Sequence, residues 1–177
     1  MVENRYFELV RRASNNVSEF TNRKERWNEY EATWKALLFH ELIQIDENVK
    51  DSISMENQAY TTNKKTWGKK FDMWLGDSFV LEVKLVWYRK QVRKDGLRKM
   101  NSKTGVRGDL KKLRDFIDSK KGSVKGIAIA VNAKRGNVTP EEIIKLVDGK
   151  LIKMLSGDLK LLVCSNGKCE YASAGGQ

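Results

Sequence analysis

A strongly apolar segment, residues 79–88, constrains the fold of this chain more than any other feature. Its length and its content of Val, Leu, Phe, Trp and Tyr predict a buried β-strand. Two charged residues, Glu82 and Lys84, interrupt the segment. Because side chains alternate between the two faces of a strand, we expect both charges on one face with Val80 and Val86. Two neighbouring charges on a buried strand must either form ion pairs or take part in binding or catalysis.

The residues before this strand predict a hairpin. Residues 76–78 have turn composition, and residues 70–75 form a second apolar run that carries Asp72. Folding back about the turn brings Asp72 opposite Glu82, where directly opposed side chains lie about 5 Å apart. Two carboxylates and the lysine at position 84 are therefore expected to converge.

Two interpretations of this cluster are open. In the first, Lys84 forms a buried salt bridge with Glu82 or Asp72. In the second, the carboxylates hold a divalent cation such as Mg²⁺, which prefers carboxylate oxygens. Lys84 would then orient or help to deprotonate a water and stabilise negative charge on a phosphate. The second interpretation is the chemistry of phosphodiester hydrolysis.

Asp72, nine intervening residues and Glu82-Val83-Lys84 resemble the motif of the PD-(D/E)XK nuclease superfamily, which includes restriction endonucleases, Holliday-junction resolvases and RecB-like nucleases. The resemblance implies an α/β restriction endonuclease-like core, with a central mixed β-sheet flanked by helices in α-βββ-α-β order. It also implies that Mg²⁺ or Mn²⁺ is held by Asp72, Glu82 and the Val83 backbone carbonyl, and that Lys84 positions the attacking water. Phe71 stands where the name of the motif has proline.

Residues 23–46 predict one helix, since apolar residues recur at three- and four-residue spacing. Glu31 and Glu41 both lie on its apolar stripe. Related nucleases often supply a glutamate from the first helix, which implies that Glu31 completes or orients the metal shell, with Glu41 as second choice. The alternative for either residue is an acid at the edge of the stripe that reaches water or pairs with a lysine.

The remaining pattern predicts one domain over residues 1–177, with the core at about 23–132 followed by a C-terminal helix and hairpin. Thr139-Pro140-Glu141-Glu142 predicts a capped helix start, and Asn166-Gly167 predicts a hairpin turn. The other expected elements are a weak strand at 52–62, a helix at 107–119, a strand at 124–131, a helix at 139–155, and strands at 159–164 and 168–171.

The charge of the chain is strongly positive and unevenly placed. The net charge is +11, and residues 84–114 contain twelve Lys or Arg against two Asp. Such an arrangement binds phosphate backbones through Coulomb attraction and the release of counterions. We therefore expect a nucleic-acid partner, with DNA preferred. The alternative is a lysine-rich surface that serves solubility. The candidate backbone contacts are Arg89, Lys90, Arg93, Lys103, Arg107 and Lys112.

Two aromatic residues near the hairpin, Trp67 and Trp74, are candidates for stacking on an unpaired base. Trp74 shares a strand face with Asp72. Packing in the core or in an interface is the alternative for both tryptophans. Stacking would place a base close to the expected site.

Several residue types and motifs that common sites require are scarce or absent, which excludes some classes of function. His40 is the only histidine, so the chain has no multi-histidine metal site and no histidine pair for acid–base catalysis. Cys164 and Cys169 form a disulfide or face each other as thiols, and two cysteines do not complete a structural zinc site. No Walker-type glycine loop is present.

Together these features predict a metal-dependent endo- or exodeoxyribonuclease. The alternatives are a non-catalytic nucleic-acid-binding protein on the same fold and an interaction protein whose tryptophans build an interface. No segment approaches the roughly 20 apolar residues that cross a membrane, and residues 1–17 do not resemble a signal peptide. A cytoplasmic protein without a membrane partner is therefore expected. Many small relatives of the family act as dimers, so a homodimer is an open alternative.

Overall fold

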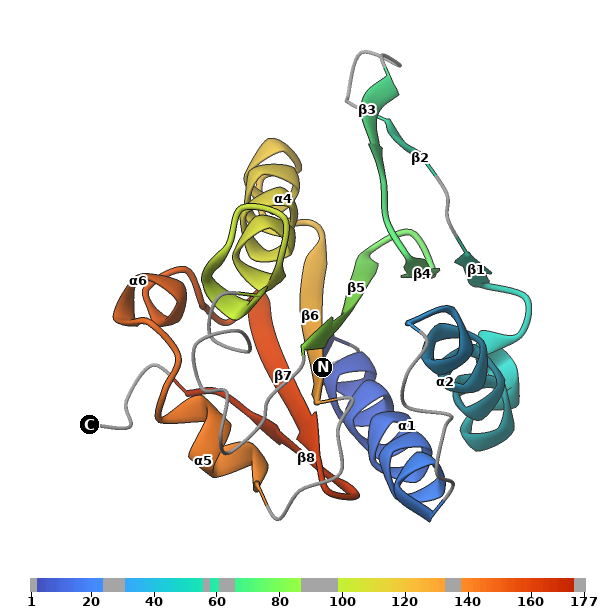
Figure 1. The fold of residues 1–177 in the computed structure, drawn as a ribbon. Coiled ribbons are helices and arrows are strands. Elements are labelled where there is room, and N and C mark those ends of the chain that lie inside the picture. The colour runs from blue at the N-terminus through green and yellow to red at the C-terminus, as the bar shows by residue number, and fades with distance from the viewer. Residues whose placement is uncertain are drawn as a thin grey trace.

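A six-stranded sheet with helices on both faces forms the body of the protein (Figure 1). The computed structural model describes residues 3–23, 31–55, 58–60, 66–86, 99–132 and 138–173. The strand order in the sheet is β1-β4-β5-β6-β7-β8. The elements of the sheet and its covering helices are α1 (Glu3–Arg23), α2 (Glu31–Ile45), η2 (Glu47–Val49), β1 (Ile53–Met55), β4 (Met73–Leu75), β5 (Phe79–Val86), α4 (Val106–Ser119), β6 (Lys125–Asn132), α5 (Pro140–Ile144), α6 (Gly149–Ile152), β7 (Leu159–Ser165) and β8 (Lys168–Tyr171).

The sheet is mixed. β1, β4 and β5 are antiparallel, β5, β6 and β7 are parallel, and β7 and β8 are antiparallel. β5 and β6 pair along their whole length, from Phe79 with Lys125 to Val86 with Asn132. Central parallel strands are buried on both faces, which explains the nearly continuous apolar sequence of both strands. The predicted strands at 79–88 and 124–131 are confirmed over residues 79–86 and 125–131.

The two faces of the sheet build two separate cores. Phe79, Leu81, Val83 and Leu85 pack with α1 and α2, whereas Val80 and Val86 pack with α4, α5 and α6. This alternation confirms the predicted division of β5 between its faces. Glu82 and Lys84 therefore belong to the α4 side of the strand.

The second half of the chain follows the local sequence signals closely. α4 matches the expected helix at 107–119, and Leu110, Leu113, Phe116 and Ile117 are buried on one side of it. Thr139 and Glu142 form the predicted capping box. β7 and β8 form the predicted hairpin, with Asn166 at φ 51° and Gly167 at φ 78° in its turn. Cys164 and Cys169 are paired across this hairpin and joined by a disulfide.

Four predictions about elements need correction. The strand expected at 52–62 is divided into β1 and β2 (Gln58–Tyr60), because β2 pairs with β3 (Thr66–Lys70) in a separate two-stranded sheet. This β2–β3 hairpin projects away from the body (Figure 1). The run at 70–75 becomes a strand only at β4, since Lys70 ends β3.

The helix expected at 139–155 is two short helices, because Asp148 caps a new start by accepting a hydrogen bond from the Lys150 N–H. The helix α1 was not predicted at all. The helix expected at 23–46 is described from Glu31 as α2, and residues 24–30 lie outside the described part of the chain. Among the described helices, none is long and apolar enough to cross a membrane.

Candidate functional site

The unequal lengths of β4 and β5 create an open edge beside Glu82. β4 pairs only with Phe79–Leu81, so within the described part of the chain the rest of β5 has no partner strand on this side. Met73 lies opposite Leu81, which places Asp72 beside Glu82. The Asp72 Oδ2 atom accepts a hydrogen bond of 2.7 Å from the Val83 N–H. The Asp72 carboxylate thus accepts a backbone hydrogen bond that a neighbouring strand would otherwise accept.

Glu31, the first residue of α2, reaches the same edge from a different element. Its Oε2 atom accepts a hydrogen bond of 3.4 Å from the Leu85 N–H and lies 3.5 Å from the Lys84 Nζ atom. Glu41 instead accepts a hydrogen bond of 3.0 Å from the Asn16 side chain. The structure therefore brings Glu31, and not Glu41, to the carboxylates of the hairpin.

Two further lysines hold these carboxylates. Lys35, one helical turn after Glu31, places its Nζ atom 3.0 Å from Glu31 and 2.8 Å from Asp72. Lys112 of α4 forms an ion pair with Glu82 and donates a hydrogen bond of 2.8 Å to the Lys70 carbonyl. In the first of the two interpretations Lys84 pairs with a hairpin acid, whereas in the structure Lys84 pairs with Glu31.

Asp109, in the first turn of α4, is a member of the cluster that sequence reasoning missed. Its Oδ2 atom is buried and has no hydrogen-bond partner among the described residues. Burial raises the pKa of Asp109 to about 6, because the attraction of Lys84 and Lys112 only partly offsets it. The spacing of three residues between Asp109 and Lys112 on one helix face was the available signal.

Glu82 and Glu31 sit in different electrostatic environments. Burial, and then repulsion by Asp72, raise the pKa of Glu82 to about 8, although Lys112 opposes the rise. Burial also acts to raise the pKa of Glu31, but hydrogen bonding and attraction by Lys35, followed by Lys84, hold that pKa below its ordinary value. Burial lowers the pKa of Lys35, and its bonds to Asp72 and Glu31 more than reverse this. Glu82 and Asp109 are carboxyl groups of the cluster with a raised pKa, and the rise is larger for Glu82.

The residues predicted to contact nucleic acid differ in where the structure places them. Lys103 and Arg107 are exposed at the start of α4, whereas Lys112 is turned toward Glu82. Arg89, Lys90 and Arg93 lie outside the described residues. Arg107 lies on the same helix as Asp109 and Lys112, and Lys103 lies just before that helix, so their positive charge borders the cluster.

The donor set suits a hard divalent cation. Asp72 and Glu82 offer carboxylate oxygens, which Mg²⁺ and Mn²⁺ prefer. The N–H and C=O groups of a strand residue point to the same side, so the Val83 carbonyl faces the open edge together with the N–H that Asp72 binds. A search of the described residues finds no group of three or more His, Cys, Asp or Glu placed to hold a metal. A cation here would have to compete with Lys112 and Lys35 for the two carboxylates.

Comparisons of the chain with protein-family models, with curated proteins and with solved structures found no match. A functional assignment must therefore come from the cluster itself. Its members are contributed by α2, the β4–β5 hairpin and α4, which are far apart in the sequence. Four carboxylates and three lysines at one sheet edge can bind a cation, orient water and stabilise the charge of a phosphate.

Proposed function

We propose that this protein is a metal-dependent nuclease that hydrolyses phosphodiester bonds in nucleic acid, with DNA as the expected polymer. The observation that carries the proposal is the meeting of Asp72, Glu82, Lys84 and Glu31 at the open edge of β5. The order α2, β1, β4, β5, α4, β6 also follows the helix, three strands, helix and strand of a restriction endonuclease-like core. The β2–β3 hairpin is then an insertion between the first and second core strands.

In this proposal Asp72, Glu82 and the Val83 carbonyl would hold Mg²⁺ or Mn²⁺. The bound cation would supply Lewis-acid activation and neutralise charge on the phosphate. Lys84 would orient the attacking water, and its own position would be fixed by Glu31, whose Oε2 atom lies 3.5 Å away. Hydrolysis adds the water oxygen to phosphorus and breaks one P–O ester bond, which leaves a phosphate on one product and a hydroxyl on the other.

Positive charge around the cluster supports a polyanionic substrate. Arg107 and Lys111 are exposed and lie four residues apart on α4, and Lys103 is exposed just before this helix. These side chains would contact backbone phosphates without reading sequence. Binding is therefore expected to weaken steeply as the salt concentration rises.

A second candidate function is non-catalytic nucleic-acid binding on the same fold. The contacts Lys35–Asp72 and Lys112–Glu82 favour it, because the two ammonium groups occupy the carboxyl oxygens that a cation would need. This alternative predicts salt-sensitive binding and no cleavage with any metal. A homodimer would be compatible with either function.

The deciding experiment is cleavage of a labelled panel of linear duplex, single strand, flap, four-way junction and RNA with Mg²⁺, Mn²⁺ or EDTA. We expect metal-dependent cutting that falls at least about 100-fold in Asp72→Asn, Glu82→Gln and Lys84→Ala, with folding retained. Glu31→Gln should also lose activity, whereas Glu41→Gln is its matched control on the same helix. Full activity in the first three variants would refute the proposed site, and binding without cutting in every metal would support the alternative.

A further inference from the structure

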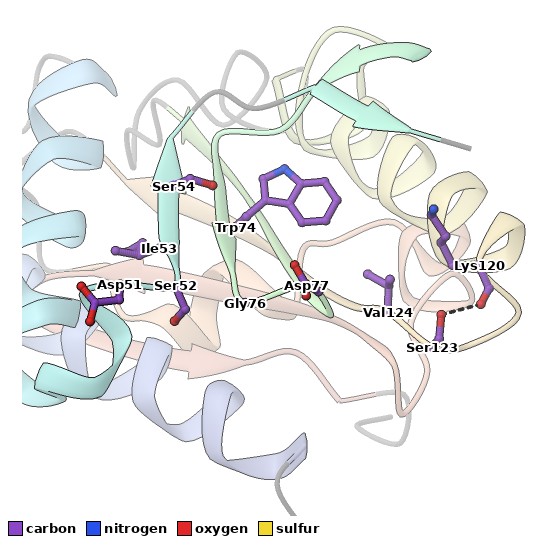
Figure 2. A pocket seen from close by; sticks show the side chains of 10 residues that line it. All are labelled: Asp51, Ser52, Ile53, Ser54, Trp74, Gly76, Asp77, Lys120, Ser123 and Val124. Carbon is purple, nitrogen blue, oxygen red and sulfur yellow. Dashed lines mark hydrogen bonds between the residues drawn. The ribbon is translucent and has the colours of Figure 1, made fainter. Parts of the chain in front are cut away.

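A pocket of about 880 Å³ lies between β1, the β4–β5 turn and the segment that follows α4 (Figure 2). Its residues Trp74 and Val124 belong to the core on the Glu82 side of the sheet, whereas Ile53 packs against the other core. The volume is within the range of about 300–1,000 Å³ that small-molecule sites occupy. The proposed nuclease chemistry does not use this pocket.

Trp74 is the one aromatic residue among the described residues that line the pocket. Figure 2 shows its indole ring projecting from β4 toward the side where Lys120 lies. Its neighbours Phe71 and Phe116 meet it at 82° and 78°, so neither ring stacks on the indole. Its Nε1 atom is buried without a hydrogen-bond partner in the described part of the chain.

The polar groups of the pocket suit a nucleobase better than a phosphate. Asp51 and Asp77 are exposed carboxylates at the pocket, and Lys120 is the one cationic side chain among its described lining residues. Two carboxylates repel a phosphate but accept hydrogen bonds from the amino groups of adenine, cytosine or guanine. Ser52 and Ser123 add hydroxyl groups. Stacking of a base on an aromatic side chain is typical of single-stranded nucleic-acid sites.

The pocket and the proposed catalytic cluster are connected through Trp74 and Phe71. Asp72 lies just before β4 and Trp74 within it, two residues apart, so their Cα atoms are at most about 7 Å from each other. Phe71 contacts Trp74 and also lies under the Lys112 ammonium at 4.9 Å, and Lys112 pairs with Glu82. A nucleotide next to a phosphate at the cluster would thus have its base within reach of Trp74.

We propose that this pocket binds an unpaired base adjacent to the phosphate that is cut, with the base stacked on Trp74. The substrate class is then nucleic acid with a single-stranded segment at the cleavage position, and not continuous duplex. This inference rests on the proposed function for the identity of its ligand. The residues that select the structure of the substrate would then lie on β1, β4 and the end of α4.

The test measures binding in EDTA, so that cleavage does not enter. Fluorescein-labelled single strands of about 12 nucleotides and a blunt duplex of the same sequence serve as probes. Trp74→Ala is expected to weaken single-strand binding about 10-fold and to leave duplex binding unchanged, because one stacking contact is lost. Trp74→Phe should retain part of the affinity. Phe20→Ala, which removes an exposed aromatic side chain on α1, is the matched control and should change neither affinity.

A second variant tests the pocket independently, in case Trp74→Ala does not fold. Ser123→Phe fills the opposite wall from an exposed position and leaves the contacts of Trp74 with Phe71 and Phe116 intact. It should reproduce the selective loss of single-strand binding. Unchanged single-strand affinity in both variants, or an equal loss for duplex, would overturn the base pocket while leaving metal-dependent cleavage to be judged by the panel. Selective loss in a protein that never cuts would instead retain the pocket and refute the nuclease.

Discussion

Glu82→Gln is expected to stabilise the folded protein, and to do so more strongly as the pH rises. Glu82 is only 5% exposed, and its pKa is raised from 4.5 to about 8. Between these two values the unfolded chain releases the proton while the folded protein keeps it. Wild-type stability therefore loses a contribution as the pH rises from 4.5 to 8, and this loss stays constant above pH 8. Glutamine resembles the protonated acid and does not titrate.

The pKa difference sets the size of the effect. A rise of the pKa from 4.5 to about 8 corresponds to about 5 kcal/mol above pH 8, and to about 3 kcal/mol at pH 7. The attraction of Lys112 is already contained in this pKa, since Lys112 faces the carboxyl group in the folded protein. We therefore expect Glu82→Gln to be about 3 kcal/mol more stable than wild type at pH 7, with a difference near zero below pH 4.5.

Urea unfolding of both proteins at several pH values between 4 and 8 measures this difference. Glu41→Gln, which removes a carboxylate that contacts Asn16 outside the cluster, is the control for a general change in charge. Parallel stability curves for wild type and Glu82→Gln would refute the reasoning. They would mean that Glu82 is ionised in the folded protein near pH 5, as an exposed glutamate is.

Three further predictions concern the same cluster. Cleavage at a fixed, subsaturating Mg²⁺ concentration should increase with pH and level off near pH 8, because the cation needs the ionised Glu82; a profile that is flat from pH 6 to 8 would contradict this. Asp109→Asn should move the midpoint of that profile to lower pH, since repulsion by Asp109 contributes to the raised pKa of Glu82, and an unchanged midpoint would exclude the coupling. Lys112→Met should raise the pKa of Glu82 further and shift the midpoint upward, whereas Lys111→Met, which removes the exposed neighbouring lysine, should reduce only the salt dependence of DNA binding.

The parts of the fold that sequence reasoning predicted best depend on local signals. β5 and β6 are long apolar runs, α4 has a clear 3.6-residue pattern, and the β7–β8 hairpin has an Asn-Gly turn. The approach of Asp72 to Glu82 was also predictable, because a short turn fixes the register of a hairpin. These features need no knowledge of how distant elements pack.

The missed parts of the site depend on packing between distant elements. Lys35 contacts Asp72 only because α2 lies against the β4–β5 hairpin, and the two residues are 37 positions apart. Asp109 enters the cluster because α4 crosses over β5, although its own sequence neighbourhood is that of a solvated helix start. Propensity and periodicity carry no information on such contacts.

The helix α1 is a different case, because its signal was present. Phe7, Val10, Ala13 and Val17 recur at three- and four-residue spacing and are buried against α2 and the sheet. The surrounding residues are strongly polar, so the stripe is narrow. α1 also precedes the element order that the family resemblance implies, which left it without an assigned place.

The open edge of β5 links the structure of this sheet to its proposed chemistry. A strand edge exposes N–H and C=O groups that require partners, and here carboxylates of Asp72 and Glu31 accept the N–H groups of Val83 and Leu85. These carboxylates therefore stabilise the backbone, and Glu31 also contacts Lys84. Removing either one by alanine would leave a strand N–H without its acceptor, at a cost of about 1–3 kcal/mol, and would mix a folding defect with a catalytic one. The amide variants keep a side-chain oxygen that can accept the same hydrogen bond, so a loss of cleavage in Asp72→Asn and Glu31→Gln reports on the charge that the proposed reaction needs.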